Sequence, residues 1–423
     1  MGPTHRQLTT DVLVCGGSFA GVAAALAAAR AGRRVLLLER RTYLGAEVSA
    51  YLRPWLTPSQ LDVLCSLLGP TLSAAAGPLQ EPGPALAAAA VPLQEPGPVQ
   101  AELPLIPDRL KTALEDVLLE AGVTLLYAVR PVGIRTGRPL QVEAVGKAGR
   151  MTIAAGAVID ATEQAVLARL CCPASARTAQ AGARLWRTLE LTGVDTAGAR
   201  PAGDPRAGGV SIPEKLTPAW RLHAGYARDL GHVLLEYAMD VPAAGEPGWQ
   251  QDAEQRARWI GADLCRWMRE NHPAFSGMRL ASTSHELAVP PLWRVEPDPG
   301  QRLFVASACT DLPDDEAARL YLDPAALTRL GLSVGTQVAD LATSPGPALS
   351  AARSAAATPS AGVTPPAVAA PSVVAAASPV ASPAAVATPS PVAAPSAVVA
   401  PPRVASPPTD LAASADATAA AVA

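Results

Sequence analysis

A glycine-rich hexapeptide near the N-terminus is the segment best suited to hold a ligand. It stands between a short apolar run and an alanine-rich run. Its residues are Gly16, Gly17, Ser18, Phe19, Ala20 and Gly21. A first glycine permits a tight turn, and a last glycine lets the following helix pack closely on the strand. The free amides of the first helical turn favour a negative group. The spacing therefore predicts a turn that binds the diphosphate of a dinucleotide.

Two side chains refine this prediction. Glu39 lies 18 residues beyond Gly21, at the end of the next apolar run. A carboxylate there accepts hydrogen bonds from ribose hydroxyls, and it would repel the 2′-phosphate of NADP. Ser18 stands where a second glycine usually lets the backbone approach the diphosphate. Because serine is small and its hydroxyl can donate a hydrogen bond, we expect binding to be weakened or adjusted but retained.

The segments around the turn predict one strand–helix–strand unit of about 30 residues. Asp11–Cys15 is an apolar run typical of a strand buried on both faces of a parallel sheet. Gly21–Ala31 is alanine-rich and favours a helix, which Gly32 would end. Arg34–Glu39 predicts the second strand. The alternative is an alanine-rich helix after a tight turn, with an unrelated glutamate.

Later segments extend the pattern to an α/β fold with a parallel central sheet. Residues 130–153 contain the turn signals of a hairpin or small sheet, and a helix is expected around Asp252–Glu270. The other expected helices are Pro107–Ala121 and Pro324–Leu341, and the other expected strands are Val123–Tyr127, Ala157–Thr162 and Leu303–Ser307. The sequence thus predicts a Rossmann-like FAD/NAD(P)-binding fold with a small inserted second domain.

Composition predicts the domain boundaries. The heptapeptide PLQEPGP occurs at Pro78–Pro84 and again at Pro92–Pro98, so we expect residues 57–99 to be a surface insertion made by local duplication. Residues 343–423 consist mostly of alanine, proline, valine, serine and threonine, which predicts a disordered tail with polyproline-II bias. We expect a discontinuous nucleotide-binding domain at 8–56, 100–172 and 295–342, and a substrate or cap domain at 173–294.

The sequence resembles FAD-dependent oxidoreductases with a glutathione-reductase-type FAD-binding fold, in particular their bacterial branch. Asp11–Ala25 and Leu37–Ala46 match the opening of that family, and three later segments extend the likeness to roughly a fifth of the chain. Those segments are Ala121–Ile134, Val158–Thr162 and Leu303–Gly335. The resemblance implies FAD as cofactor. It also implies further cofactor-binding residues, namely Arg40, Gly45, Val132 at the adenine, Ala161, Thr162 and Ser307.

The sequence departs from the family pattern along the same track. Glu163 stands at a glycine position of the family, Gln164 at a position that is often acidic, and Ala308 where many relatives carry an acid. Together with Ser18, these departures raise the possibility of weakened FAD binding or lost redox function.

Catalytic candidates are few, because a flavin needs little from the protein beyond orientation and electrostatics. His285 and Glu286 could form an acid/base pair above the flavin ring, or they could be a surface histidine and a solvated glutamate. Arg319, expected in the loop before the last helix, could stabilise a reduced flavin or be a solvated arginine. The acidic run Asp314–Glu316 suits a helix start or a solvated loop better than a metal site.

Charge and cysteine content exclude other classes of protein. The formal net charge is −3 with no block of like charge, so neither nucleic acid nor an anionic membrane is an expected partner. The apolar stretch Val22–Leu38 is interrupted by arginines and is too short to span a bilayer. None of the six cysteines forms a C-x-x-C pair, and no metal site is expected. With no secretory signal in residues 1–10, we expect a cytoplasmic protein.

The sequence thus predicts an FAD-dependent oxidoreductase that moves a hydride between a small organic substrate and flavin. A degenerate homologue, which binds a nucleotide or a partner protein without turnover, is the alternative. An NAD-dependent dehydrogenase is disfavoured by the strand and helix that return near residues 303–341. The substrate, the electron acceptor and the oligomeric state stay open.

Overall fold

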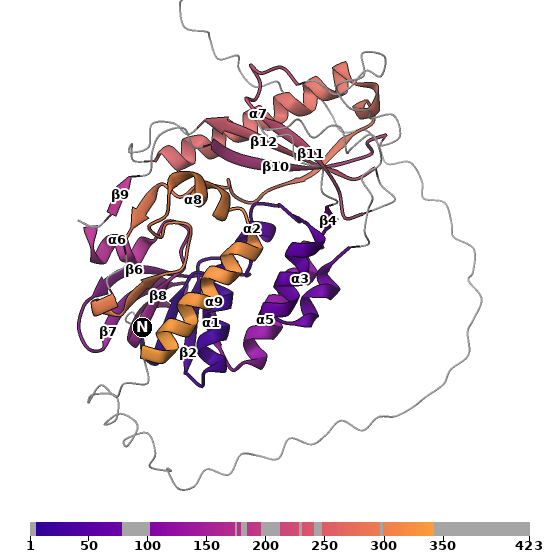
Figure 1. Ribbon diagram of the computed structural model, residues 1–423. Coiled ribbons are helices and arrows are strands. Elements are labelled where there is room, and N and C mark those ends of the chain that lie inside the picture. The colour runs from indigo at the N-terminus through magenta and orange to yellow at the C-terminus, as the bar shows by residue number, and fades with distance from the viewer. Residues whose placement is uncertain are drawn as a thin grey trace, which may run out of the picture. The chain divides into compact units, whose positions relative to one another are not determined.

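A mostly parallel sheet forms the centre of the computed structural model (Figure 1). The structure describes residues 6–77, 102–173, 176–178, 184–195, 212–227, 231–240, 248–296 and 299–341. Within these residues the sheet has seven strands, in the order β5-β2-β1-β8-β7-β6, with β15 also paired to β8. The strands are β1 (Arg6–Cys15), β2 (Val35–Glu39), β5 (Thr124–Tyr127), β6 (Val129–Arg135), β7 (Leu140–Gly146), β8 (Gly149–Asp160) and β15 (Leu303–Val305).

The strands that lead to the glycine-rich turn are parallel and buried. β1 pairs in parallel with β2 and β8, β2 with β5, and β8 with β15, whereas β7 is antiparallel to β6 and β8. In β1, Val12 and Val14 face the core that contains α1, while Leu13 and Cys15 face the core on the opposite side. Because side chains alternate along a strand, a central strand needs apolar residues at every position.

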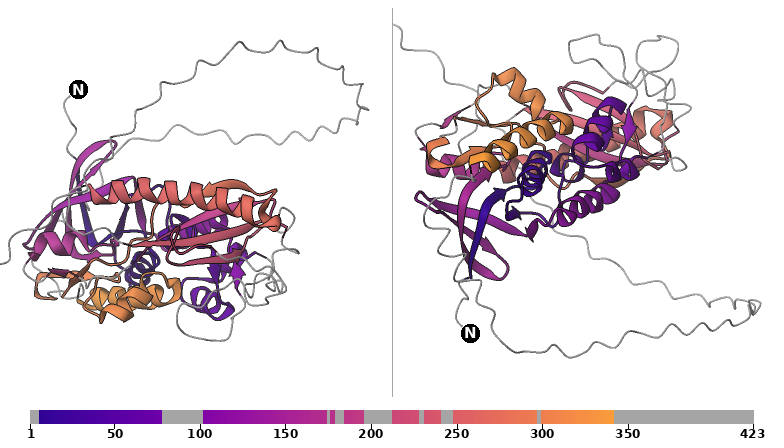
Figure 2. Two further views of the ribbon diagram at one scale, coloured as in Figure 1. Left: turned by 90° about the horizontal axis from the view of Figure 1, so that it is seen from above. Right: turned by 60° about the horizontal axis from the view of Figure 1, so that its bottom comes forward.

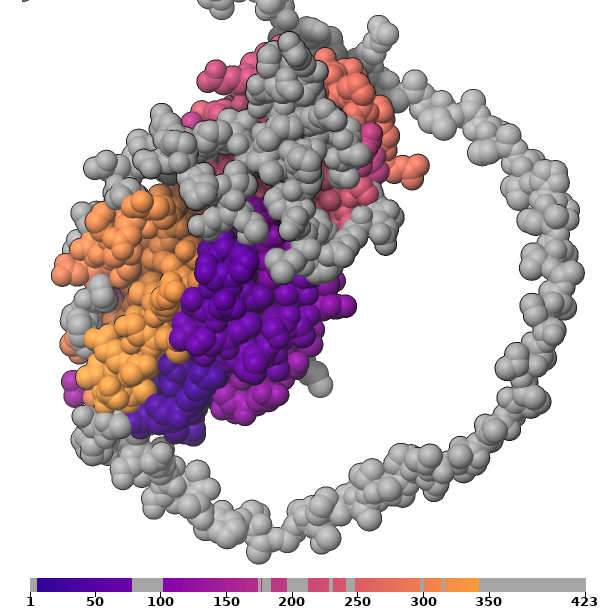
Figure 3. Space-filling view, turned by 45° about the vertical axis from the view of Figure 1, so that its right-hand side comes forward, coloured from indigo at the N-terminus to yellow at the C-terminus, as the bar shows by residue number. Residues whose placement is uncertain are grey.

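Helices α1 (Phe19–Arg30) and α9 (Pro324–Leu341) lie side by side against the sheet (Figures 1 and 2). Their close approach depends on glycine, because a side chain at Gly331 or Gly335 would overlap the backbone of α1. In the space-filling view, α9 and the N-terminal helices form one continuous surface (Figure 3). The other helices around the sheet are α2 (Ala46–Ser49), α3 (Pro58–Leu67), α5 (Pro107–Glu120), α6 (Val166–Cys171) and α8 (Asp314–Leu320).

A second, antiparallel sheet has four described strands in the order β11-β12-β10-β13. Helix α7 (Trp249–Asn271) lies along it (Figure 1), and Leu264 and Met268 of α7 pack on Leu235 and Tyr237 of β12. These strands are β10 (Arg184–Thr192), β11 (Trp220–Ala224), β12 (Val233–Asp240) and β13 (Arg279–Thr283). Two short ladders pair β3 (Trp55–Leu56) with β4 (Leu103–Pro104) and β9 (Ala176–Thr178) with β14 (Trp293–Val295). Three short 3-10 helices, η1 (Pro70–Ala75), η4 (Pro273–Phe275) and η5 (Pro299–Gln301), complete the described elements.

The predicted α/β fold with a parallel central sheet is confirmed. The last helix has the predicted bounds, and the expected helix around Asp252–Glu270 is α7. One difference lies in the segment predicted to be a surface insertion, where Pro58–Leu67 forms α3 and its Leu64 is part of the main core. Thr57 and Gln60 form a capping box there, and Pro58 stands at the first position of the helix, where proline is well tolerated.

Other predictions concern residues outside the described ranges. Both PLQEPGP copies and the alanine- and proline-rich tail fall there. Among the described helices, none combines the length and the apolar character that crossing a bilayer requires.

Candidate nucleotide-binding site

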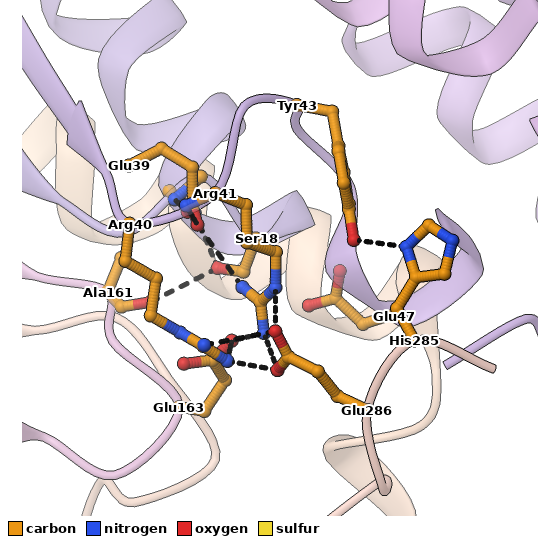
Figure 4. A network of polar contacts seen from close by, with 12 residues as sticks. Ser18, Glu39, Arg40, Arg41, Tyr43, Glu47, Ala161, Glu163, His285 and Glu286 are labelled. Carbon is orange, nitrogen blue, oxygen red and sulfur yellow. Dashed lines mark hydrogen bonds and ion pairs between the residues drawn. The ribbon is translucent and has the colours of Figure 1, made fainter. Parts of the chain in front are cut away.

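The site lies where the central parallel strands end. Cys15 of β1 is level with Leu38 of β2 on one side and with Asp160 of β8 on the other. The segments that follow these three strands therefore meet at one edge of the sheet, which is where open α/β sheets bind their ligands. Figure 4 shows the side chains that these segments bring together.

The glycine-rich turn requires glycine at its two ends. Gly16 has φ of +111°, and a side chain there would overlap the carbonyl of Ala161, which follows β8. A side chain at Gly21 would overlap the carbonyl of Gly16. The backbone of the turn thus runs as closely against β8 and α1 as the spacing predicts.

The hydroxyl of Ser18 forms hydrogen bonds with the backbone of the protein itself. It is the N-cap of α1, where its hydroxyl accepts a hydrogen bond from the amide of Gly21 at 3.2 Å. The same hydroxyl donates to the carbonyl of Ala161 at 3.3 Å. An N-cap serine stabilises a helix by about 1 kcal/mol. Ser18 therefore fastens the turn to both α1 and β8.

Glu39 faces the turn from the end of β2. Its Oε2 accepts from the amide of Gly17 at 2.5 Å, and its Oε1 accepts from the amide of Arg41 at 2.8 Å. Burial raises the pKa of Glu39, and the positive charge of Arg41 opposes that rise. The carboxylate is thus held beside the turn, as the sequence predicts for a group that binds ribose hydroxyls.

Two arginines after Glu39 gather carboxylates from distant segments. We define the arginine–glutamate cluster as Glu39, Arg40, Arg41, Glu163 and Glu286 (Figure 4). Arg41 Nη2 lies 2.6 Å from Glu163 Oε1 and 2.8 Å from Glu286 Oε2. Arg40 Nη1 donates to Glu286 Oε1 at 3.0 Å. Burial opposes the ionisation of Glu163, but the charges of Arg41 and Arg40 outweigh it and lower its pKa to about 2.

Glu47 is a member of the site that the sequence analysis did not single out. It lies in α2, and its Oε2 accepts from the amide of Phe19, the first residue of α1, at 3.3 Å. Burial raises the pKa of Glu47 to about 7, and the charge of Glu163 adds to that rise. Its segment passes the turn, because the amide of Gly45 donates to the carbonyl of Gly17 at 2.8 Å. No local pattern in the sequence indicates this contact.

The turn retains donors suited to a diphosphate. Ser18 and Ala20 are buried, and within the described residues their backbone amides meet no acceptor. Buried amides without a partner are costly, so an anionic ligand at the start of α1 would supply the acceptors that they need. With Glu39 beside them, the residues present fit the diphosphate and ribose of an ADP moiety.

The other predicted cofactor-binding residues differ in their surroundings and in their exposure. Thr162 donates to Asp160 Oδ1 at 2.6 Å, which shapes the end of β8. Val132 lies on β6 with 51% of its surface exposed. Ser307 follows β15, is buried, and accepts from the amide of Cys309 at 3.3 Å. Their roles toward a cofactor stay predictions.

The catalytic candidates occupy different places. Glu286 belongs to the arginine–glutamate cluster, and the neighbouring His285 is exposed, with its Nδ1 2.8 Å from the hydroxyl of Tyr43. Arg319 lies within α8 rather than in the loop that we expected before the last helix. The acidic run Asp314–Glu316 begins that helix, in agreement with its interpretation as a helix start.

The fold and this turn define a Rossmann-like flavoprotein. Residues 11–185 match the family described as FAD dependent oxidoreductase. This part of the chain is therefore similar to the FAD-dependent oxidoreductases, over less than half of the 423 residues. No curated protein sequence matches the chain.

Solved structures share the fold at low sequence identity. A geranylgeranyl bacteriochlorophyll reductase-like protein from Thermoplasma acidophilum is 16% identical with a TM-score of 0.52, and the match covers 80% of each chain. Aklavinone-11 hydroxylase, solved with FAD and aklavinone, is 16% identical with a TM-score of 0.52, over 80% of this chain and 63% of that one. The myxobacterial chondrochloren halogenase CndH is 14% identical with a TM-score of 0.53, over 80% and 76% of the two chains.

Proposed function

We propose that the protein is an FAD-dependent oxidoreductase that transfers a hydride between a small organic substrate and flavin. One observation carries the proposal. The glycine-rich turn presents buried amides at the start of α1, and the Glu39 carboxylate stands beside them, bound to Gly17 at 2.5 Å. These residues lie within the segment that matches the FAD dependent oxidoreductase family.

The chain's own groups supply binding and orientation. The amides of Ser18 and Ala20 would donate to the diphosphate, Glu39 would accept from the ribose hydroxyls, and Val132 would contact the adenine. FAD supplies an electron-accepting ring when bound, and the protein positions and tunes that ring. The arginine–glutamate cluster has two arginines and three carboxylates, so it adds no net positive charge that could offset the negative charge of a diphosphate.

A groove beside His285 supports a place for the substrate. It has a volume of about 450 Å³ and lies between α7 and β13, with Leu189, Leu280 and His285 among its lining residues. Ser284 Oγ and Arg187 Nε line the same groove, are buried, and have no hydrogen-bond partner among the described residues. Substrate pockets combine apolar walls with a few such polar groups. We assign this groove to the substrate, with His285 as the nearest acid/base group.

A cytoplasmic location is part of the proposal. All six cysteines are free thiols in the structure, which suits a reducing compartment.

The test is flavin binding followed by flavin reduction. The purified protein should be yellow or should take up added FAD, and the bound flavin should lose its visible absorbance when a suitable organic hydride donor is added. Glu39→Gln should weaken FAD binding by about tenfold or more, the equivalent of about 1.4 kcal/mol for the lost charged acceptor. The control is Glu143→Gln, because Glu143 of β7 forms an ion pair with Arg135 on the protein surface. This variant should bind FAD as the wild type does.

A homologue that binds a nucleotide without turnover is the second candidate. The observation that favours it is Glu163, which departs from the family's glycine and is held within the chain by Arg41 at 2.6 Å. Binding of ADP and FAD with no reduction of the flavin by any organic hydride donor would support this candidate over an oxidoreductase. A colourless protein that refuses both nucleotides would overturn both.

A further inference from the structure

Glu47 occupies part of the anion-binding position at the start of α1. Oε2 of Glu47 accepts a hydrogen bond from the amide of Phe19 at 3.3 Å, as either an ionised or a neutral carboxyl can. Glu47 is 5% exposed. Phe19 is the first residue of a helix of 12 residues, so its amide is one of the donors that the helix offers to an anion. The two neighbouring amides, of Ser18 and Ala20, have no acceptor within the described chain. Of these three adjacent amides, one therefore already donates to a side chain of the protein itself, that of Glu47.

The charges around Glu47 disfavour a second anion. Glu163, Tyr51 and Arg41 lie close enough to interact electrostatically with Glu47. Arg41 is already paired with Glu39, Glu163 and Glu286, so it offers little uncompensated positive charge. An ionised Glu47 and a diphosphate at the same helix end would therefore repel each other across a buried site, where charges are weakly screened.

We propose that Glu47 is an internal competitor of the diphosphate group, and that a nucleotide binds at the start of α1 only when the Glu47 carboxyl is protonated or displaced. This inference rests on the proposed nucleotide site. It adds a regulation to that site, because proton uptake at Glu47 and nucleotide binding favour each other.

The local structure allows Glu47 to move away. α2 has only four residues and begins after Gly45, which has φ of +67°. Beyond its own amide, the carboxyl of Glu47 accepts only the amide of Phe19 among the described residues. A side chain held by so few hydrogen bonds is displaced more easily than the members of the arginine–glutamate cluster.

The test compares ADP and FAD binding by calorimetry in the wild type, Glu47→Gln and Glu47→Ala, between pH 6 and pH 9. The pKa of Glu47, raised to about 7 by burial, sets this range. In the wild type, the Kd of ADP should rise with pH and approach about a tenfold increase per pH unit above pH 7. In both variants the Kd should stay nearly constant, and at pH 8 it should be about tenfold lower than in the wild type.

Glu190→Gln is the matched control, because Glu190 is also a hydrogen-bonded glutamate with little exposure but lies in the four-stranded sheet. It should keep the pH dependence of the wild type. Equal Kd values for the wild type and both Glu47 variants, or weaker binding in the variants, would overturn the inference. So would failure of all of them to bind ADP. Tighter ADP binding in the variants with a flavin that cannot be reduced would support the inference and count against the oxidoreductase activity alone.

Discussion

Single side chains set the chemistry of the nucleotide-binding turn. Glu39 and Ser18 hold the backbone of the turn in place through hydrogen bonds. Glu47 has the opposite character, since it is a buried carboxyl whose ionisation the site disfavours. Two predictions follow from these differences.

Glu47 should make the protein less stable as pH rises. Its pKa in the folded chain is about 7, above the ordinary value of 4.5. The unfolded chain therefore loses its proton first, so the stabilisation is complete below about pH 4.5 and is lost as pH rises through 7. Glu47→Gln should be more stable than the wild type at pH 8, by up to about 3 kcal/mol, and similar at pH 4.5. Urea unfolding at both pH values measures this, and an identical pH dependence in both proteins would contradict it.

Ser18 should matter more for the turn than for the ligand. Ser18→Ala should lower the free energy of unfolding by about 1 kcal/mol, because the cap of α1 is lost. Ser18→Gly should cost only a few tenths of a kcal/mol, since glycine is an acceptable N-cap. Removal of the side chain should also let a diphosphate approach more closely, so FAD should bind more tightly to Ser18→Gly. Weaker binding would show instead that the hydroxyl is a ligand.

The packing of secondary-structure elements brings the turn to its place. Six of the nine buried residues of α1 are alanine or glycine, and α9 meets this helix through Gly331 and Gly335. A small-residue contact of this kind brings two helix backbones close together, and larger side chains cannot be added without displacing one helix. The position of α1 on the sheet thus depends on a helix more than 300 residues further along the chain.

Gly331→Ala should separate α9 from α1. The new methyl group would overlap the carbonyl of Ala20, so the free energy of unfolding should fall by about 1–3 kcal/mol. Gly133→Ala on β6 is the control, because a side chain there would meet only ordinary contacts with Glu143 at 3.7 Å. Thermal unfolding followed by circular dichroism distinguishes the two variants, and equal melting temperatures would refute the packing argument.

Across the whole molecule, a buried ionic link joins the nucleotide-binding sheet region to the four-stranded sheet. Arg53, which follows α2, binds Glu236 of β12 at 2.5 Å. Trp55 stacks on His223 of β11 with ring centroids 3.6 Å apart. Burial opposes the ionisation of Glu236, but Arg53 and His223 outweigh it and lower its pKa to about 2. This link fixes the four-stranded sheet relative to the segment that leaves the site.

Glu236→Gln should be strongly destabilising, because it leaves Arg53 buried without its partner. We expect a loss of about 3 kcal/mol in the free energy of unfolding. Glu143→Gln, which breaks the exposed pair with Arg135, should cost less than about 1 kcal/mol. Guanidinium unfolding of both variants makes the comparison, and a loss for Glu236→Gln no larger than for the control would contradict the role of the link.

The sequence by itself determined the glycine-rich turn, the strand–helix–strand unit and the place of Glu39, because these depend on spacing within about 30 residues. It also predicted α9 and α7, whose apolar periodicity is local. Only the tertiary structure decided that Glu47 meets Phe19, 28 residues away, and that Arg41 meets Glu163 and Glu286, 122 and 245 residues away. Contacts at such separations depend on how the strands are ordered and the loops packed, and no local pattern of residues encodes them.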